Sequence, residues 1–502
     1  MEKVNLNVKN TAAFGFSFLL IFLVCILVRL PHFLSKDFFF DGDEAMIGIM
    51  AQDFLSGKGL SLYFYGQNYG FSSLEVLSTS LFIKLIGNGI WALRLGGLLL
   101  FSIGITFIWK SLRETKVSLM ISIICVLFFA MSPTWFLWGS LVRGGYVTAF
   151  MCFGILFYIT LLKKTDWSWV MIAAVFFMIA YESQPLIFIP ILPFLVQWML
   201  PFKLNFRKIF GFITVSFLLA LLIHYLGANE TIWSPPKSAF FDMQQIQNLT
   251  TQIGGMIYSY SNFFYYTMDI PIPLWWFVLL SISLGLIATY ICLFFWKSEK
   301  RVKYFILGMV LSLLLSMFLI STVSMYSPRY WLGFFTGILF LFSYAIIKGT
   351  FVKARLTILI SVVLIYGIGL ITVNELKRDW YYANVNELEA FDEVYQYAKK
   401  KDVKAIYTID DLIQWKWNYL YGVDIPCTAF HEKERVSFFK NSVRDYYLNR
   451  KDENVVIGYY NIYDGFKVND EFLTNIEQVN SKYFIIRNVS DEKIDSAYRY
   501  FK

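Results

Sequence analysis

Long apolar runs, about eleven in number, determine what kind of structure this chain of 502 residues can adopt. Most are long enough for a helix to cross the hydrocarbon layer of a membrane, which is about 30 Å thick. Charged residues make up only 16% of the chain, whereas soluble domains carry about 25%. The pattern therefore predicts an α-helical polytopic membrane protein with about eleven transmembrane helices. The runs lie at 13–30, 89–110, 117–132, 146–162, 167–182, 185–201, 208–227, 271–296, 303–323, 330–348 and 354–373.

Basic residues gather in the short loops that follow every second run. Because cytoplasmic loops are rich in Lys and Arg, these loops and the N-terminus are predicted to be cytoplasmic. The long loops 31–88 and 228–270 and the C-terminal tail are then extracytoplasmic. This topology largely explains the net charge of +8, so we expect the lipid bilayer, and no nucleic acid, as a partner. The basic residues are Lys110, Arg113, Lys116, Lys163, Lys164, Lys203, Arg207, Lys208, Lys297, Lys300, Arg301, Lys303, Lys348, Lys353 and Arg355.

Residues 374–502 have the composition of a soluble protein and predict a small extracytoplasmic α/β domain. They contain no glycine-rich phosphate loop, zinc-ligand spacing or nucleophile elbow. The chain thus divides into a membrane domain, residues 1–373, which includes both long external loops, and this C-terminal domain. The expected elements of the C-terminal domain are a helix at 388–401, followed by a turn and a strand that ends by 410, strands at 454–460 and 482–488, and a helix at 491–501.

The external loop 31–88 carries many acids for so apolar a chain: Asp37, Asp41, Asp43, Glu44, Asp53 and Glu75. Two interfacial helices are expected in this loop, one capped by Asp43 and ended by Gly57, and one at 74–86. A carboxylate at a membrane face needs a metal, a proton donor or a cationic ligand as partner. Uncompensated charge near hydrocarbon is costly.

Asp43 and Glu44 allow two interpretations. In the first, they are a helix cap and a first-turn acid that stabilise the helix. In the second, they form a catalytic site, where a carboxylate acts as a base or binds a divalent cation. Glu75, at the start of the second helix, has the same two options. Three residues between the helices are expected in a turn or in contact with a sugar; they are Gln67, Asn68 and Tyr69.

Three arginines are expected on the same side of the membrane as the acids: Arg94, Arg143 and Arg329. Each can pair with a structural carboxylate or hold a phosphate, which a guanidinium binds through two parallel hydrogen bonds. Glu182, at the external end of an apolar run, is expected either as a partner of Arg143 or as a second acid of the site.

The order of several short motifs resembles that of the GT-C glycosyltransferases. Within this group the sequence is similar to the dolichyl-phosphate-mannose protein mannosyltransferases and the bacterial aminoarabinose transferases. The resemblance covers the membrane region and implies a GT-C-like arrangement of its helices. The motifs are DGDEA at 41–45, GQNYG at 66–70, SSLE at 72–75, ALRL at 92–95 and SPRYW at 327–331.

The resemblance implies a reaction and roles for individual residues. Such enzymes pass a sugar from a polyprenyl-phosphate carrier to a glycan, lipid or protein acceptor on the external face, usually with inversion. Asp43 matches the acid that acts as base on the acceptor hydroxyl, and Glu44 accompanies it. Arg329 would hold the carrier phosphate, as cationic stabilisation of this leaving group requires, and Arg143 and Arg94 are expected to assist.

The same resemblance raises the question of a metal. Glu75 corresponds in position to an acid implicated in metal or donor binding, so Mg, Mn or Zn is considered as a cofactor, with Asp43 and Glu182 as further ligands. Family members often carry a second acid in the loop after the third span, and this chain has none there. Either Glu182 substitutes for it or the metal is absent. Tyr330, beside Arg329, is expected to contact substrate.

Two other functions remain open at this point. A flippase or transporter of lipid-linked sugars would also be polytopic and aromatic, but it predicts polar groups within the spans and broken helical repeats. A noncatalytic subunit of envelope assembly is favoured if the acids are only helix caps. The gathering of charge in external loops favours the transferase.

Overall fold

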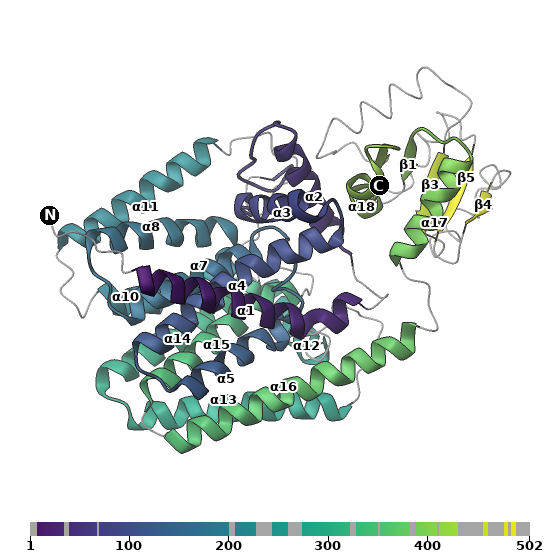
Figure 1. The fold of residues 1–502 in the computed structure, drawn as a ribbon. Helices are drawn as coiled ribbons and strands as arrows, with labels where there is room; N and C mark the ends of the chain where they lie inside the picture. Colours follow the sequence, from purple (N-terminus) through teal and green to yellow (C-terminus); the bar gives the residue numbers. More distant parts are fainter. Residues whose placement is uncertain are drawn as a thin grey trace.

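The structure is a computed structural model, and a helical bundle makes up most of it (Figure 1). It describes residues 8–34, 40–67, 70–199, 206–226, 243–259, 274–321, 328–349, 352–381, 387–408, 411–429, 455–459, 476–479 and 483–487. The bundle and its loops contain α1 (Val8–Leu34), α2 (Gly42–Leu55), α3 (Ser73–Ile86), α4 (Ile90–Glu114), α5 (Leu119–Ala130), α6 (Pro133–Phe136), α7 (Tyr146–Leu161), α8 (Trp167–Ser183), α9 (Pro185–Phe188), η1 (Ile189–Ile191), α10 (Leu192–Met199), α11 (Phe206–Leu226), α12 (Met243–Ser259), α13 (Leu274–Lys297), α14 (Lys300–Ile320), η3 (Pro328–Trp331), α15 (Leu332–Lys348) and α16 (Val352–Tyr381).

Each predicted apolar run coincides with a helical segment. Within the described residues, seven helices are long and apolar enough to cross a membrane, and they belong to α1, α4, α11, α13, α14, α15 and α16. Four shorter apolar segments, at Leu119–Ala130, Tyr146–Leu161, Trp167–Ser183 and Pro185–Met199, account for the other runs. The chain is thus a multi-pass membrane protein, while the number of eleven crossings and the orientation of the termini stay predictions.

The centre of the bundle is the contact between α4 and α7. Every residue of α7 is buried. A Cβ placed on Gly154 of α7 would lie 2.5 Å from the carbonyl oxygen of Gly104 on α4, so glycine is needed where the two backbones meet. Such small-residue contacts let helices approach closely in membranes, where packing replaces the hydrophobic effect as the driving force.

The opposite ends of α4 and α7 differ in charge. At one end the Glu114 carboxylate forms ion pairs with Lys164, whose Nζ lies 3.6 Å from Oε2, and with Lys110, whose Nζ lies 4.0 Å from Oε1. The residues of the acidic loop lie at the other end, next to the segment that precedes α7. The basic loops after α4 and α7 therefore share one end of the bundle, as the predicted topology requires.

One buried cation in α1 departs from the expectation of nearly charge-free spans. Arg29 is completely buried. Its Nε donates to the carbonyl oxygen of Phe136 at 2.6 Å, and its Nη2 donates to that of Trp135 at 2.9 Å. Both carbonyls belong to α6, so Arg29 helps to fix the chain just before the loop that carries Arg143.

The C-terminal part contains a five-stranded sheet with strand order β2-β1-β3-β5-β4. The pairs β1–β2 and β1–β3 are parallel, and β3–β5 and β4–β5 are antiparallel. The strands expected at 454–460 and 482–488 are β3 and β5, and the helix expected at 388–401 is α17; the helix expected at 491–501 lies outside the described residues. The elements are α17 (Glu387–Lys400), β1 (Ile406–Thr408), α18 (Asp411–Tyr421), β2 (Cys427–Ala429), β3 (Val455–Tyr459), β4 (Ile476–Gln478) and β5 (Tyr483–Arg487).

Candidate active site

The helix that carries the acids begins at Gly42, one residue before the catalytic candidate Asp43. The prediction that Asp43 caps α2 is wrong, because Asp41 is the N-cap. Asp41 has an extended backbone, with φ −94° and ψ 144°, and its side chain accepts a hydrogen bond from the Asp43 N–H at 3.2 Å. Asp43 therefore lies in the first helical turn, where its charge favours the N-terminal end of the helix dipole. At the other end Ser56 is the C-cap and Gly57 has a φ of +85°.

α2 is buried on most sides. It packs against α3 and against α18 of the C-terminal part. From residue 42 to residue 51 every residue of α2 except Asp43 is buried. The buried residues are Gly42, Glu44, Ala45, Met46, Ile47, Gly48, Ile49, Met50 and Ala51. Asp43 is therefore the acid of this segment that the packing leaves accessible.

Asp43 and Asp41 share one arginine. Arg143, from the loop before α7, donates through Nε to Asp43 Oδ2 at 3.1 Å, and its Nη2 lies 3.0 Å from the same oxygen. Arg143 also forms an ion pair with Asp41. The side chain of Asp43 is 24% exposed, whereas that of Asp41 is 6% exposed. The guanidinium thus links a buried acid to an accessible one, and it packs over the ring of Trp138.

Glu44 has a different environment. Its Oε2 lies 3.0 Å from Nη2 of Arg94 in α4, and both side chains are 0% exposed. Burial raises the pKa of Glu44 to about 7, while the charge of Arg94 opposes this shift. Arg94 was expected either to pair with a structural carboxylate or to hold a phosphate. In the structure it pairs with the carboxylate of Glu44. This closed pair joins α2 to α4 and leaves no access for a phosphate at Arg94.

Glu75 also lies in the interior. Its carboxyl is completely buried and faces the start of α7, where the N–H groups of Gly145, Val147 and Thr148 stabilise the ionised form. Burial is the stronger influence and raises the pKa of Glu75 to about 8. A carboxyl in this position holds α3 against the N-terminus of α7, because the exposed N–H groups of a first helical turn need an acceptor.

The other expected polar residues are distributed around this cluster. Glu182 Oε2 accepts a hydrogen bond from Tyr63 at 2.8 Å, whereas the ion pairs of Arg143 are with Asp41 and Asp43. Gln67 lies in a turn, where its N–H donates to the Phe64 carbonyl at 3.0 Å. Its two expected companions, Asn68 and Tyr69, lie outside the described residues.

The described acids do not fit the expected metal site. Asp43, Glu75 and Glu182 each have a separate environment, with Arg143, the start of α7 and Tyr63 respectively. Across the part of the chain that the structure describes, no three His, Cys, Asp or Glu side chains gather as metal ligands would.

Arg329 lies on the same side as the acids. It belongs to the 3₁₀ turn η3 that leads into α15, and it interacts electrostatically with Arg143 and Tyr146. Its Nη2 donates to the hydroxyl of Tyr330 at 3.3 Å, and its guanidinium lies over the Tyr330 ring. Its buried Nε has no hydrogen-bond partner among the described residues. Two cations that influence each other electrostatically, one with a donor that has no partner among the described residues, suit an anionic ligand.

Two members of this cluster were missed by sequence reasoning as site residues. Asp41 stands in the DGDEA motif, so the motif itself contained the signal. Lys416, on α18, is 5% exposed. Burial raises the pKa of Asp41, and the charges of Arg143 and, more weakly, of Lys416 oppose this shift. Nothing in the local sequence connects Lys416 to residues near position 41, because α18 packs on α2 only in the folded chain.

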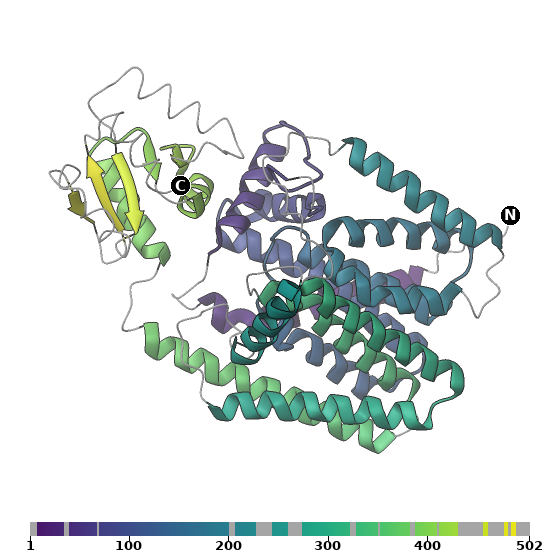
Figure 2. The ribbon, with the colours of Figure 1, turned by 180° about the vertical axis from the view of Figure 1, so that it is seen from behind.

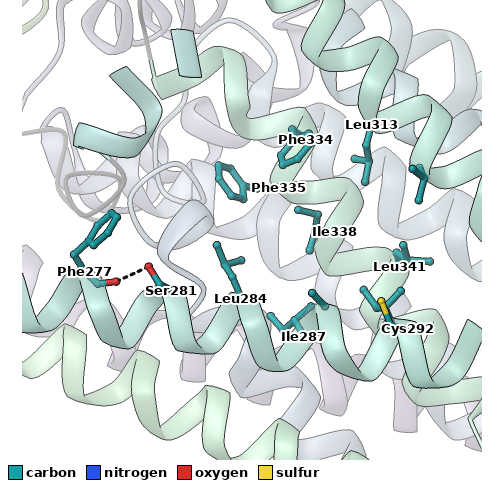
Figure 3. Close-up of a pocket in the computed structure, with 13 residues that line it drawn as sticks. Phe277, Ser281, Leu284, Ile287, Cys292, Leu313, Phe334, Phe335, Ile338 and Leu341 are labelled. Carbon is teal, nitrogen blue, oxygen red and sulfur yellow. Dashed lines mark hydrogen bonds between the residues drawn. The ribbon is translucent and has the colours of Figure 1, made fainter. Parts of the chain in front are cut away.

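An apolar cavity of about 440 Å³ opens between α13, α14 and α15 (Figure 3). Phe334, Phe335 and Ile338 of α15 face Leu284 and Ile287 of α13 across it. The helix α15 starts directly after the turn that carries Arg329. The cavity therefore lies along the helix whose first turn belongs to the charged cluster.

Comparison with known proteins gives a family-model match to part of the chain and a similar fold over nearly all of it. Residues 77–226 match the model of the dolichyl-phosphate-mannose-protein mannosyltransferase family. A search of curated proteins found no match. Two crystal structures of ArnT from Cupriavidus metallidurans are similar in fold. The apo form has 13% sequence identity and a TM-score of 0.59, with 95% of this chain and 98% of that chain covered.

The second structure is the same protein bound to undecaprenyl phosphate. It has 12% identity and a TM-score of 0.57, and the match covers 97% of this chain and 99% of that chain. Because the match extends over nearly the whole of both chains, it includes the C-terminal part as well as the bundle. The chain therefore has the fold of ArnT, and its resemblance to the GT-C glycosyltransferases, through the mannosyltransferase family model, is confirmed.

Proposed function

We propose that this protein is a glycosyltransferase that moves a sugar from a polyprenyl-phosphate donor to an acceptor hydroxyl at the external membrane face. The observation that carries the proposal is the arrangement around Arg143, which holds the accessible carboxylate of Asp43 and interacts electrostatically with Arg329. The family match and the ArnT structure that binds undecaprenyl phosphate support the class of donor. The acceptor is a glycan, a lipid or a protein.

Asp43 is the group that this proposal places as the base. It is the most accessible of the four acids in the cluster, since Asp41, Glu44 and Glu75 are buried. A carboxylate oxygen of Asp43 takes the proton of the acceptor hydroxyl while the hydroxyl oxygen attacks the anomeric carbon. Attack from the face opposite the phosphate inverts the configuration at that carbon.

Arg329 stabilises the leaving group. As the bond between the anomeric carbon and the phosphate oxygen breaks, its electron pair stays on the phosphate. A guanidinium stabilises this developing charge without protonating it. The buried Nε of Arg329, which lacks a partner within the described residues, is a suitable donor. No step passes through a metal, in keeping with the separate environments of Asp43, Glu75 and Glu182.

The apolar cavity is the proposed position of part of the isoprenoid chain. Its lining is almost entirely hydrocarbon, and Ser281, its hydroxyl residue, donates to the Phe277 carbonyl at 2.9 Å (Figure 3). A chain bound there would extend along α15 from a phosphate held at Arg329. The active site and the C-terminal part are proposed to face the outside of the cell, and the N-terminus the cytoplasm.

The experiment compares cells with and without the protein. Loss of the protein should remove one sugar from an envelope glycan, lipid or protein and should leave the matching polyprenyl-phosphate sugar to accumulate. Wild-type protein should reverse both effects, and Arg329→Ala should reverse neither. Arg301→Ala, at an exposed arginine near the start of α14, is the matched control and should behave as wild type.

The possible outcomes separate the candidate functions. Glycans that are unchanged in the absence of the protein would contradict the proposal. A donor that accumulates only on the cytoplasmic leaflet would favour a flippase instead. Purified protein that transfers the accumulated donor sugar in vesicles would distinguish the enzyme from a noncatalytic subunit.

A further inference from the structure

The C-terminal part of the chain packs directly on the helix that carries the acids. Helix α18 lies against α2 in both views of the molecule (Figures 1 and 2). Gln52 of α2 donates through Nε2 to the carbonyl oxygen of Tyr419 at 3.1 Å. The Tyr419 hydroxyl donates to the carbonyl oxygen of Gly89, just before α4, at 3.0 Å. α18 is therefore fixed to two elements of the membrane domain.

The fit between these helices depends on a glycine. A Cβ placed on Gly48 would lie 2.3 Å from Cε2 of the Tyr419 ring, closer than real Cβ contacts allow. The same ring also contacts Phe40, with centroids 6.1 Å apart. The Tyr419 ring thus fills the space that a side chain at position 48 would need. This close fit holds α18 in one position on α2.

Helix α18 belongs to two apolar cores at once. Trp415 and Tyr419, four residues apart, belong to the core of the membrane domain. Ile413 and Trp417 belong to the core beneath the sheet. Residues four apart lie on the same face of a helix, so α18 has one face for each core. Lys416, at the flank of these faces, is buried as a result.

A buried lysine requires a negative charge nearby, because an unpaired ammonium is costly to remove from water. Lys416 lies on the helix that packs on α2, and its charge favours the ionised form of Asp41, the N-cap of α2, less strongly than the charge of Arg143 does. Asp41 in turn pairs with Arg143, which holds Asp43. Positive and negative side chains thus alternate in the series of interactions that leads from the C-terminal part to the proposed base. The series is Lys416, Asp41, Arg143 and Asp43.

We propose that Lys416, supplied by the C-terminal part, is a positioning residue for transfer, which shares the charge of Asp41 and thereby leaves Arg143 to hold Asp43. This inference rests on the proposed function. Without Lys416, the buried carboxylate of Asp41 draws Arg143 toward itself and away from Asp43. The positive charge available to the donor phosphate near Arg143 also falls.

Three variants of the full-length protein test this role in vesicles, with the polyprenyl-phosphate sugar that accumulates in cells lacking the protein. Lys416→Met should lower kcat roughly 10- to 100-fold, the scale of a positioned group displaced by about 1 Å, with a smaller change in KM. Lys416→Arg, which keeps the charge, should retain most of the rate. Lys416→Met combined with Asp41→Asn should recover most of the loss, because asparagine keeps the N-cap but removes the charge.

Recovery in the double variant is the decisive result, since a merely structural lysine would not be rescued by removing a charge on α2. Wild-type kcat in Lys416→Met, or a double variant as slow as the single one, would overturn the inference. An inactive wild-type protein would instead refute the proposed function, so the two failures are distinguishable. Thermal unfolding of each variant verifies that the protein is folded.

A second variant keeps the inference testable if Lys416→Met does not fold. Gly48→Ala displaces Tyr419 and with it α18, while every charged residue stays in the chain. Transfer should fall by a similar factor. Gly15→Ala, where the added Cβ meets nothing within 4 Å, is the control. An unaltered rate in Gly48→Ala would contradict a role for the docked α18.

Discussion

Asp43 and Glu44 are neighbours in sequence, lie in the same helical turn and each pair with an arginine, yet their environments are opposite. Asp43 is 24% exposed beside Arg143, which it shares with Asp41. Glu44 and Arg94 are both 0% exposed. The first pair is open to a ligand, and the second is closed inside the junction of α2 and α4.

The difference shows that neighbouring acids of one motif can have different roles, one in chemistry and one in packing. The accessible pair can exchange a proton and meet a phosphate. The closed pair cannot do either, and a buried ion pair contributes to register and packing more than to chemistry. The expectation that Glu44 accompanies Asp43 as a catalytic group is therefore replaced by the proposal that Glu44 and Arg94 support it.

The strongest way to break this comparison is to neutralise the open acid. Asp43→Asn should reduce transfer by about 10²- to 10⁴-fold, the contribution of a general base, and leave thermal unfolding unchanged. Asp53→Asn is the matched control, because Asp53 lies on the same helix and binds Lys58 at 2.7 Å. Full activity of Asp43→Asn in a vesicle assay would remove Asp43 from the mechanism.

Neutralising the closed acid should have the converse effect. Glu44→Gln leaves the buried Arg94 without its countercharge, so the free energy of unfolding should fall by about 3–5 kcal/mol. The folded fraction should keep far more activity than Asp43→Asn does. Replacing the pair together, as Glu44→Leu with Arg94→Met, should restore much of the stability measured by thermal unfolding. A Glu44→Gln variant as stable as wild type would contradict the closed pair.

The buried acid Glu75 also predicts how stability depends on pH. Burial raises the pKa of Glu75 from 4.5 to about 8. Since the folded state holds this proton more tightly than the unfolded state, its contribution is complete below about pH 4.5 and is lost as pH rises through about 8. Glu75→Gln should flatten this decline in unfolding temperature. An equally steep decline in that variant would exclude Glu75 as its source.

The smallest effect is expected at the acid outside the arginine cluster. Glu182→Gln keeps a polar partner for Tyr63 and should reduce transfer by less than about tenfold, which is under about 1.4 kcal/mol of transition-state stabilisation. The measurement is kcat/KM with the same donor, beside Asp43→Asn. A loss as large as that of Asp43→Asn would return Glu182 to the site as a second acid.

Much of this organisation could be predicted because it depends on local pattern. Apolar length located the helices, and short runs rich in β-branched and aromatic residues located β3 and β5. Helix α18 was not predicted, because both of its faces are buried and its sequence, DLIQWKWNYLY, lacks the polar face that marks an amphipathic helix. The N-cap was assigned to Asp43 instead of Asp41, since both are aspartates and residue type alone cannot distinguish them as caps.

The sequence by itself determined that acids and arginines gather at the loop ends of an apolar helical bundle. Only the tertiary structure decided which acid meets which arginine. Consecutive helical residues point about 100° apart, so Asp43 and Glu44 must face different neighbours. Whether a neighbour is the packed α4 or the loop before α7 depends on contacts between segments far apart in the chain. Lys416, more than 300 residues from Asp41 in sequence, influences its charge for the same reason, because α18 packs on α2.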